Sequence, residues 1–354
     1  MTTSQPSPGE LSPRSTEVLE RADLDELTML VNGLVAEACW SELATLRERC
    51  RLAVDRGRQL WPVASHIEYR LCLQGPGEWA AAMVEAGTGR FALGPLAEVA
   101  ASSHAWGDLA PYLHRTPQAA MFAHERVLRG EDLSADSAAL DLPEVLELPL
   151  RLEAWEPAYC LPDYHPDKLE TPAPKLPPLQ KPAAYDGNGG QEPGDEWDDM
   201  AEPPLDLDEA ARALQELVSP WTEESNGRAE AVSADGFAHD AIAVLGVRSP
   251  LMAELDGQTA LALMAWAAAS GGAYGRRRGG APARFGAWWA LAALGGLSDD
   301  WPVPPARLQD VLYRCRWFNW GAGEPATGWS LRLAVEVPRR AGRRSWALAA
   351  TDAR

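Results

Sequence analysis

The sequence predicts two folded parts: an α-helical N-terminal half, built as a helical bundle or short helical repeat, and a C-terminal α+β domain with a small antiparallel sheet. Three observations predict this division. Apolar residues recur at helical spacing over residues 17–159, whereas residues 160–204 are rich in proline and acidic side chains. Residues 226–354 combine helical spacing with strict alternation. We expect a disordered tail at 1–16 and an amphipathic helix at 205–225.

The N-terminal half shows helical stripes with recognisable start signals. Thr116-Pro117 supplies a capping residue followed by a first-turn proline, which predicts the start of another helix. Trp40-Ser-Glu-Leu43 recurs as Trp106-Gly-Asp-Leu109, 66 residues later. This spacing is either two periods of a 33-residue helical repeat or a coincidence, and both a bundle and a short solenoid accommodate it. The first stripe consists of Leu24, Leu27, Leu30, Val31 and Leu34.

The segment between the two parts has the composition of a linker. Eleven of the 29 prolines fall within residues 157–204, together with the acidic run from Asp195 to Asp199. Such a segment buries too little apolar surface to offset its chain entropy. The net charge of −19 is also uneven: −11 over residues 1–159, −12 over 160–225 and +4 over 226–354.

The C-terminal part is predicted to be α+β because it mixes two periodicities. Apolar residues alternate with polar or small ones over residues 329–337, and likewise over 313–317, which predicts two strands. Asp235-Gly236 between two apolar-rich runs indicates a hairpin. Ser249-Pro250 is expected to begin a buried helix that ends near residue 269, and a second helix is expected from about Ala283.

A glycine-flanked run of arginines is the most distinctive candidate binding site. Tyr274, Arg276, Arg277, Arg278 and Arg284 lie in a flexible cationic segment that leads into the second predicted helix. Guanidinium groups beside a helix N-terminus suit a phosphate or carboxylate. The alternative is that these arginines are solvated or pair with the acidic connector. The segment lacks the terminal Gly-Lys-Ser/Thr of a phosphate-binding P-loop.

Three C-terminal segments carry a resemblance to a known family. They are Tyr274-Gly-Arg-Arg-Arg-Gly continuing to Trp288-Trp289, Gly328-Trp-Ser-Leu-Arg-Leu-Ala-Val335, and Ser345-Trp-Ala-Leu348. On these segments the C-terminal half resembles an uncharacterised actinobacterial family. The resemblance implies no activity, so no residue role is carried over from it.

Several classes of site and location are not expected. The five cysteines form no CxxC pair, and there is no HExxH, so neither a disulfide framework nor a zinc site is indicated. No Gly-x-Ser-x-Gly is found, and we expect no cofactor, metal or catalytic set. No apolar run reaches about 18 residues, and the N-terminus lacks the apolar core of a signal peptide. We therefore expect a cytoplasmic protein without a membrane partner.

The resulting functional hypothesis is a protein-interaction or scaffold protein, with a partner protein or a small anionic ligand at the arginine segment. One alternative is an enzyme for a small anionic substrate, with His239 or Asp240 as acid or base. Another is a nucleic-acid-associated regulator, because residues 317–320 (Trp-Phe-Asn-Trp) follow Arg314 and Arg316. The net charge of −19 disfavours nucleic acid as a partner.

Overall fold

The computed structural model describes residues 9–86, 93–181, 207–323, 328–340 and 342–353. The chain forms two compact units, one helical and one built around a sheet, and it passes between them more than once. The helical unit comprises Met1–Val145, Pro149–Leu152 and Leu161–Thr171. The sheet unit comprises Leu146–Leu148, Glu153–Cys160 and Pro172–Arg354.

The helical unit consists of helices whose starts are fixed by local capping. Asp23 accepts hydrogen bonds from the Asp25 and Glu26 amides at 2.9 and 3.0 Å and so begins the second helix. The elements are α1 (Pro13–Arg21), α2 (Leu24–Ala36), α3 (Trp40–Asp55), α4 (Trp61–Gln74), α5 (Gly77–Ala86), α6 (Leu96–Ser103), α7 (Trp106–Leu109), η1 (Ala110–Tyr112), α8 (Pro117–Leu128) and α9 (Ser137–Leu140), with the two-residue strands β1 (Asp163–Tyr164) and β2 (Leu169–Glu170).

A buried carboxylate joins two of these helices. Glu68 on α4 is fully buried and accepts hydrogen bonds from Arg47 at 2.8 Å and from Arg51 at 2.6 Å, both on α3. Two guanidinium groups thus compensate one desolvated carboxylate, which ties α3 to α4. Trp40 and Trp106, which begin the two similar tetrapeptides, are the first residues of α3 and α7. The 33-residue repeat stays a prediction.

In the sheet unit, the described residues form one antiparallel sheet with strand order β3-β7-β6-β5-β4. The predicted fold class is therefore confirmed: a helical N-terminal part and an α+β part with a small antiparallel sheet. The elements are α10 (Leu207–Glu216), α11 (Ser219–Glu223), β3 (Arg228–Asp235), α12 (Ala238–Val244), β4 (Leu251–Leu255), α13 (Gly257–Ala269), α14 (Gly280–Gly295), η3 (Ser298–Asp300), α15 (Pro305–Arg314), β5 (Arg316–Gly321), β6 (Trp329–Arg339) and β7 (Gly342–Asp352).

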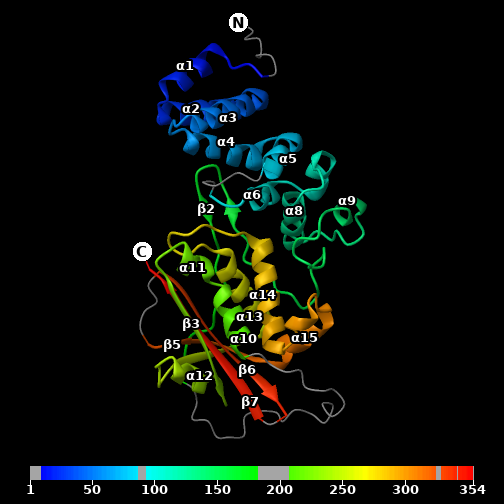
Figure 1. Cartoon of the computed structure of the whole chain (residues 1–354), viewed down its shortest axis with the longest axis vertical. Coiled ribbons are helices and arrows are strands. Elements are labelled where there is room, and N and C mark those ends of the chain that lie inside the picture. The colour runs from blue at the N-terminus through cyan, green and yellow to red at the C-terminus, as the bar shows by residue number, and fades with distance from the viewer. Residues whose placement is uncertain (1–8, 87–92, 182–206, 324–327, 341, 354) are drawn as a thin grey trace. The chain divides into compact units, whose positions relative to one another are not determined.

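Helices cover both faces of this sheet (Figure 1). The alternating residues of β6 predicted to be apolar, such as Leu331 and Leu333, face the larger core under α10, α13, α14 and α15. The opposite face packs Ala334, Phe318 and Trp320 against α12. The predicted strand at 329–337 lies within β6, because strict alternation matches a sheet whose two faces are covered differently.

Three local predictions were wrong. Asp235-Gly236 does not turn a hairpin; instead Gly236, at φ 108°, leads into α12, where Asp240 caps the Phe237 amide at 2.8 Å. Ser249-Pro250 begins no helix, because strand β4 precedes Asp256, the true N-cap of α13. The predicted strand at 313–317 also starts later, since α15 continues through Arg314.

The predicted tail and linker are partly described. Helix α1 begins at Pro13, within the predicted tail, and residues 1–8 lie outside the described residues. The described part of the predicted linker contains β1, β2 and a bridge between Gln180 and Met252 of β4. Residues 182–206, which include the whole acidic run from Asp195 to Asp199, lie outside the described residues.

Candidate functional site

The predicted arginine segment forms the loop between α13 and α14, here called the Arg loop (residues 271–279). Tyr274 is 60% exposed, Arg276 and Arg278 are exposed, and Arg277 is half-buried. The structure therefore brings four of the five predicted ligand-binding residues onto one short surface loop. Their position at the surface could be predicted from the sequence because arginine side chains are rarely fully buried.

The backbone of the Arg loop is anchored at four points. The amides donate to two side chains directly after α11, to a side chain at the end of β7 and to a carbonyl at the end of α13. Asp352, which is only 1% exposed, receives the first of these bonds. A loop whose amides are held in this way presents its side chains from a fixed frame. The bonds are Ala273 N to Asp352 Oδ2 (2.6 Å), Tyr274 N to Ser225 Oγ (3.2 Å), Arg276 N to Glu224 Oε2 (3.1 Å) and Arg278 N to Ala269 O (2.9 Å).

Glycines make this fold of the loop possible. A Cβ on Gly271 would lie 2.2 Å from the carbonyl oxygen of Gly275, and a Cβ on Gly275 would lie 2.3 Å from that of Gly271. Gly272 has φ +70°, and a Cβ there would meet Asp352 Oδ2 at 2.2 Å. The chain therefore crosses itself at a distance that only glycine permits.

A tryptophan cluster lies beneath the Arg loop. Trp221 is buried and donates from Nε1 to Ser270 Oγ at 2.9 Å, directly before the loop. Its ring packs edge-on against Trp266 and Trp329, with centroids 6.3 and 6.1 Å away. Gly272 approaches the same indole, with its Cβ position 3.2 Å from Trp221 Cγ. This rigid aromatic base explains part of the high tryptophan content.

Arg284, the fifth predicted ligand-binding residue, does not lie on the loop surface. It belongs to the second turn of α14, is 0% exposed and forms a buried ion pair with Glu156. Its Nε and Nη2 lie 2.8 and 2.6 Å from the two carboxylate oxygens. Arg284 is thus committed to a partner 128 residues away, which no local pattern could have indicated.

The Glu156 carboxylate is the centre of a buried polar cluster. Besides Arg284 it accepts hydrogen bonds from Trp288 Nε1 at 3.1 Å, Tyr159 Oη at 2.5 Å and the Glu153 amide at 2.9 Å. Burial, and then the neighbouring Glu156 charge, raise the pKa of Tyr159 well above its ordinary value. The cluster fixes residues 153–160 to α14 within the sheet unit.

The structure separates the predicted acid–base pair from the Arg loop. His239 and Asp240 lie at the start of α12, where Gly236 N binds Arg343 O at the beginning of β7. The Arg loop is bound to Asp352, at the other end of the same strand. Nine residues of extended strand span about 30 Å. His239 and Asp240 therefore do not meet a substrate held by the Arg loop.

The aromatic residues that suggested nucleic-acid binding are buried in the sheet. Trp317 lies in the larger core and donates from Nε1 to Leu312 O at 2.9 Å, while Phe318 and Trp320 lie under α12. These rings are covered on both sides and do not offer a face to a base. Arg316 lies over Phe318, with its guanidinium carbon 5.1 Å from the ring centroid.

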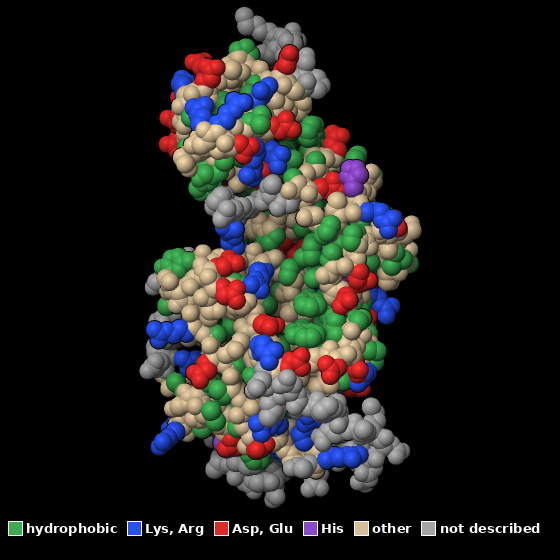
Figure 2. Space-filling view, viewed as in Figure 1, with side chains coloured by type: hydrophobic (Ala, Val, Ile, Leu, Met, Phe, Trp, Pro, Cys, Tyr) green, Lys and Arg blue, Asp and Glu red, His purple; other side chains and the backbone are tan. Residues whose placement is uncertain are grey.

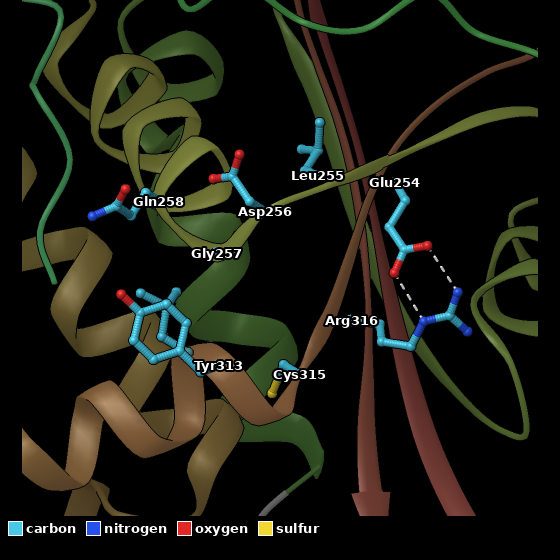
Figure 3. Close-up of a pocket in the computed structure, with 9 residues that line it drawn as sticks. Glu254, Leu255, Asp256, Gly257, Gln258, Tyr313, Cys315 and Arg316 are labelled. Carbon is cyan, nitrogen blue, oxygen red and sulfur yellow. Dashed lines mark hydrogen bonds and ion pairs between the residues drawn. The ribbon is translucent and has the colours of Figure 1, made fainter. Parts of the chain in front are cut away.

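A second candidate site, missed in the sequence, is a cavity of about 360 Å³ in the sheet unit. It lies where β4 leads into α13 and α15 leads into β5, and these junctions adjoin because Leu255 pairs with Trp317. Figure 3 shows Asp256 and Gln258 above the Tyr313 ring on one side, and the Glu254–Arg316 pair on the other. The lining is Glu254, Leu255, Asp256, Gly257, Gln258, Leu312, Tyr313, Cys315 and Arg316.

The thiol at the base of the cavity is unreactive. Burial raises the pKa of Cys315 to about 12, and the neighbouring Arg314 and Arg339 only partly oppose this. A thiol with so little thiolate is no nucleophile, so Cys315 acts as a small apolar wall. In the described ranges, no group of three or more His, Cys, Asp or Glu side chains is placed to hold a metal ion.

Taken together, these features define a protein with a helical unit and an α+β unit that carries a cationic loop with a hydrogen-bonded backbone. Residues 25–354 match the model of a family described as a family of unknown function, DUF6183, and the chain belongs to that family. An uncharacterised family with no assigned activity is therefore confirmed, but its limit to the C-terminal half was wrong, because the match covers residues of both units. The actinobacterial origin stays a prediction. No curated protein and no solved structure matches the chain.

None of the helices in the described ranges combines the length and the apolar character needed to cross a bilayer.

Proposed function

We propose that this protein is an interaction protein whose sheet unit recognises an anionic group on a partner protein through Tyr274 and Arg276–Arg278 of the Arg loop. The observation that carries the proposal is the anchored, glycine-dependent loop backbone, which presents Tyr274, Arg276 and Arg278 at exposed positions. Arg284 is left out of the binding set because Glu156 occupies its guanidinium.

The chemistry of the loop suits a phosphate or carboxylate. Each guanidinium offers a planar fork of donors that matches such groups, and a hydrogen bond to a charged group contributes about 1.5–3 kcal/mol. A fixed backbone reduces the ordering cost that a floppy arginine tail would carry. The four backbone bonds of the Arg loop therefore favour specific recognition over diffuse attraction.

The attraction has to be local. On the face shown in Figure 2, basic and acidic side chains are interspersed, and the whole chain carries a net charge of −19. The overall negative charge would repel a long polyanion such as nucleic acid. A single anionic group at the Arg loop would interact mainly with the nearby arginines. This favours a discrete group on a partner protein.

The helical unit is assigned to further contacts with the partner protein. Large apolar side chains that are exposed in the described residues occur mostly in this unit, and such side chains gain from burial against a partner. They are Leu24, Met29, Leu52, Leu93, Tyr112 and Leu140.

The proposal is tested with the full chain and two probes, inorganic pyrophosphate and a phosphoserine peptide, by thermal shift and calorimetry. We expect both probes to raise the melting temperature of the wild type. Replacing Arg276–Arg278 together by glutamine should abolish the shift, because it removes the donors without altering the glycines or the anchoring amides.

The matched control removes the same charge elsewhere on the sheet unit. Arg228 and Arg248 are exposed and the Arg307 side chain is 42% exposed, and their joint replacement by glutamine should leave the probe-induced shift intact. An equal loss in both triple variants would reduce the effect to net charge. Flat responses of the wild type to both probes would contradict the proposal.

A further inference from the structure

The cavity beside β4 and α13 contains an arginine whose donors are already bonded to two carboxylates. Arg316 donates from Nε and Nη2 to the two oxygens of Glu254 at 3.0 and 2.9 Å, as Figure 3 shows. Its Nη1 donates to Glu336 Oε2 at 3.3 Å. The guanidinium thus donates hydrogen bonds to two carboxylates, and an anionic ligand would have to compete with both.

Asp256 and Gln258, two further polar side chains of the cavity, retain hydrogen-bond acceptor positions. In the described part of the chain, Asp256 accepts hydrogen bonds from Thr259 alone, from its amide at 2.7 Å and its hydroxyl at 3.0 Å. A carboxylate has about four acceptor positions, so capacity remains. Gln258 donates from Nε2 to the carbonyls of Trp155 and Glu156 at 3.3 and 3.4 Å, which leaves its Oε1 as an acceptor.

The walls of the cavity are apolar or aromatic. Leu255, Leu312 and Cys315 are buried, and Tyr313 on α15 is 55% exposed. An exposed aromatic ring and a carboxylate that line one cavity are the combination that attracts an organic cation, through the ring quadrupole and the opposite charge. The volume of about 360 Å³ lies at the small end of the range for ligand sites.

We propose that this cavity binds a small aliphatic ammonium compound. The ammonium group lies at the Asp256 carboxylate and the Gln258 amide oxygen, and the carbon chain lies against Leu255, Leu312 and the Tyr313 ring. The positive end of the α13 dipole opposes a cation here, but Asp256 is the N-cap and already compensates that end. The carboxylate, not the helix terminus, therefore sets the preference of the cavity.

The test is calorimetry and thermal shift on the full chain with propylammonium, 1,4-diaminobutane and choline, against propionate and phosphate. Asp256→Asn removes the charge and retains the capping oxygen, since Asn caps helices as well as Asp does. We expect it to weaken ammonium binding about tenfold or more, because a charged hydrogen bond is lost. Tyr313→Leu keeps the apolar wall without the aromatic face and should weaken binding about threefold.

Asp299→Asn is the control, because Asp299 is an exposed carboxylate of the same unit outside the cavity. It should leave the affinity unchanged. The proposal is overturned if none of the ammonium compounds binds at about 10 mM, the range reached by very small ligands. It is equally overturned if Asp256→Asn binds them as the wild type does, or if propionate or phosphate displaces them from the cavity.

Discussion

Removal of the buried Arg284 guanidinium is expected to destabilise the sheet unit strongly. In Arg284→Met the aliphatic volume is largely kept, while Glu156 loses the two charged donors at 2.8 and 2.6 Å. The carboxylate stays buried at 0% side-chain exposure and retains only neutral donors from Trp288, Tyr159 and the Glu153 amide. An uncompensated buried charge is among the costliest defects in a protein interior.

The magnitude follows from this geometry. Breaking a buried ion pair by removing one partner costs about 3–5 kcal/mol, and the three remaining donors place Arg284→Met near the lower bound, at about 3 kcal/mol. For a unit of this size, each kcal/mol lowers the melting temperature by about 2–4 °C, which gives about 6–12 °C. Glu156→Gln combined with Arg284→Met should be more stable than Arg284→Met alone, because the buried charge is then gone.

The assay is urea and thermal unfolding of the full chain, followed by tryptophan fluorescence and far-UV circular dichroism. Two units predict two transitions, and the transition of the helical unit should stay in place. Arg307→Met is the matched control: its pair with Asp300 is exposed on both sides and should contribute less than about 1 kcal/mol. A cost below about 1 kcal/mol for Arg284→Met would refute the reasoning.

Three further predictions concern other parts of the chain. Burial lowers the pKa of His66 and His104, so the folded chain binds these protons less readily than the unfolded chain, and stability should be lost as pH falls below about 6.5. His66→Gln with His104→Gln should flatten acid unfolding profiles. Burial raises the pKa of Cys50 and Cys315 to about 12, so a thiol reagent at pH 8 should label them only after denaturation. Gly272→Ala should cost about 1–3 kcal/mol in urea unfolding, since φ +70° and the Asp352 carboxylate both oppose a Cβ.

The class of fold was predictable because it rests on local periodicity. Alternation over residues 329–337 identified β6, and the cap and proline at Thr116-Pro117 identified α8. Strand β4 was not predicted because it is short and half-buried, and because it pairs with β5, more than 60 residues away. A short apolar run carries no period that distinguishes a strand from a buried helix.

The Asp235-Gly236 turn shows how nonlocal contacts decide between local options. A glycine with positive φ suits a hairpin and also suits the approach to a helix. The helix forms because Asp240 caps the Phe237 amide and because the Ala238 amide donates to Glu336 at 2.9 Å. Glu336 lies 98 residues further along the chain, so this choice could not be read from the neighbouring sequence.

The candidate sites were predictable to different degrees for the same reason. The Arg loop is contiguous in sequence, so its residue types alone indicated a cationic surface. Arg284 was assigned to it because it follows closely, but its partner Glu156 comes from a distant segment. The cavity joins Asp256 to Tyr313 through strand pairing, and neither residue stands in a motif.

The central claim, recognition of an anionic group on a partner protein by the Arg loop, is tested most directly by affinity purification from the native cell with mass spectrometry. Wild type, the triple glutamine variant at Arg276–Arg278 and the control variant at Arg228, Arg248 and Arg307 are compared at equal expression. We expect a protein that is recovered with wild type and control and lost with the loop variant, and whose recovery falls after phosphatase treatment or with added salt. Recovery of the same proteins with all three chains would contradict it.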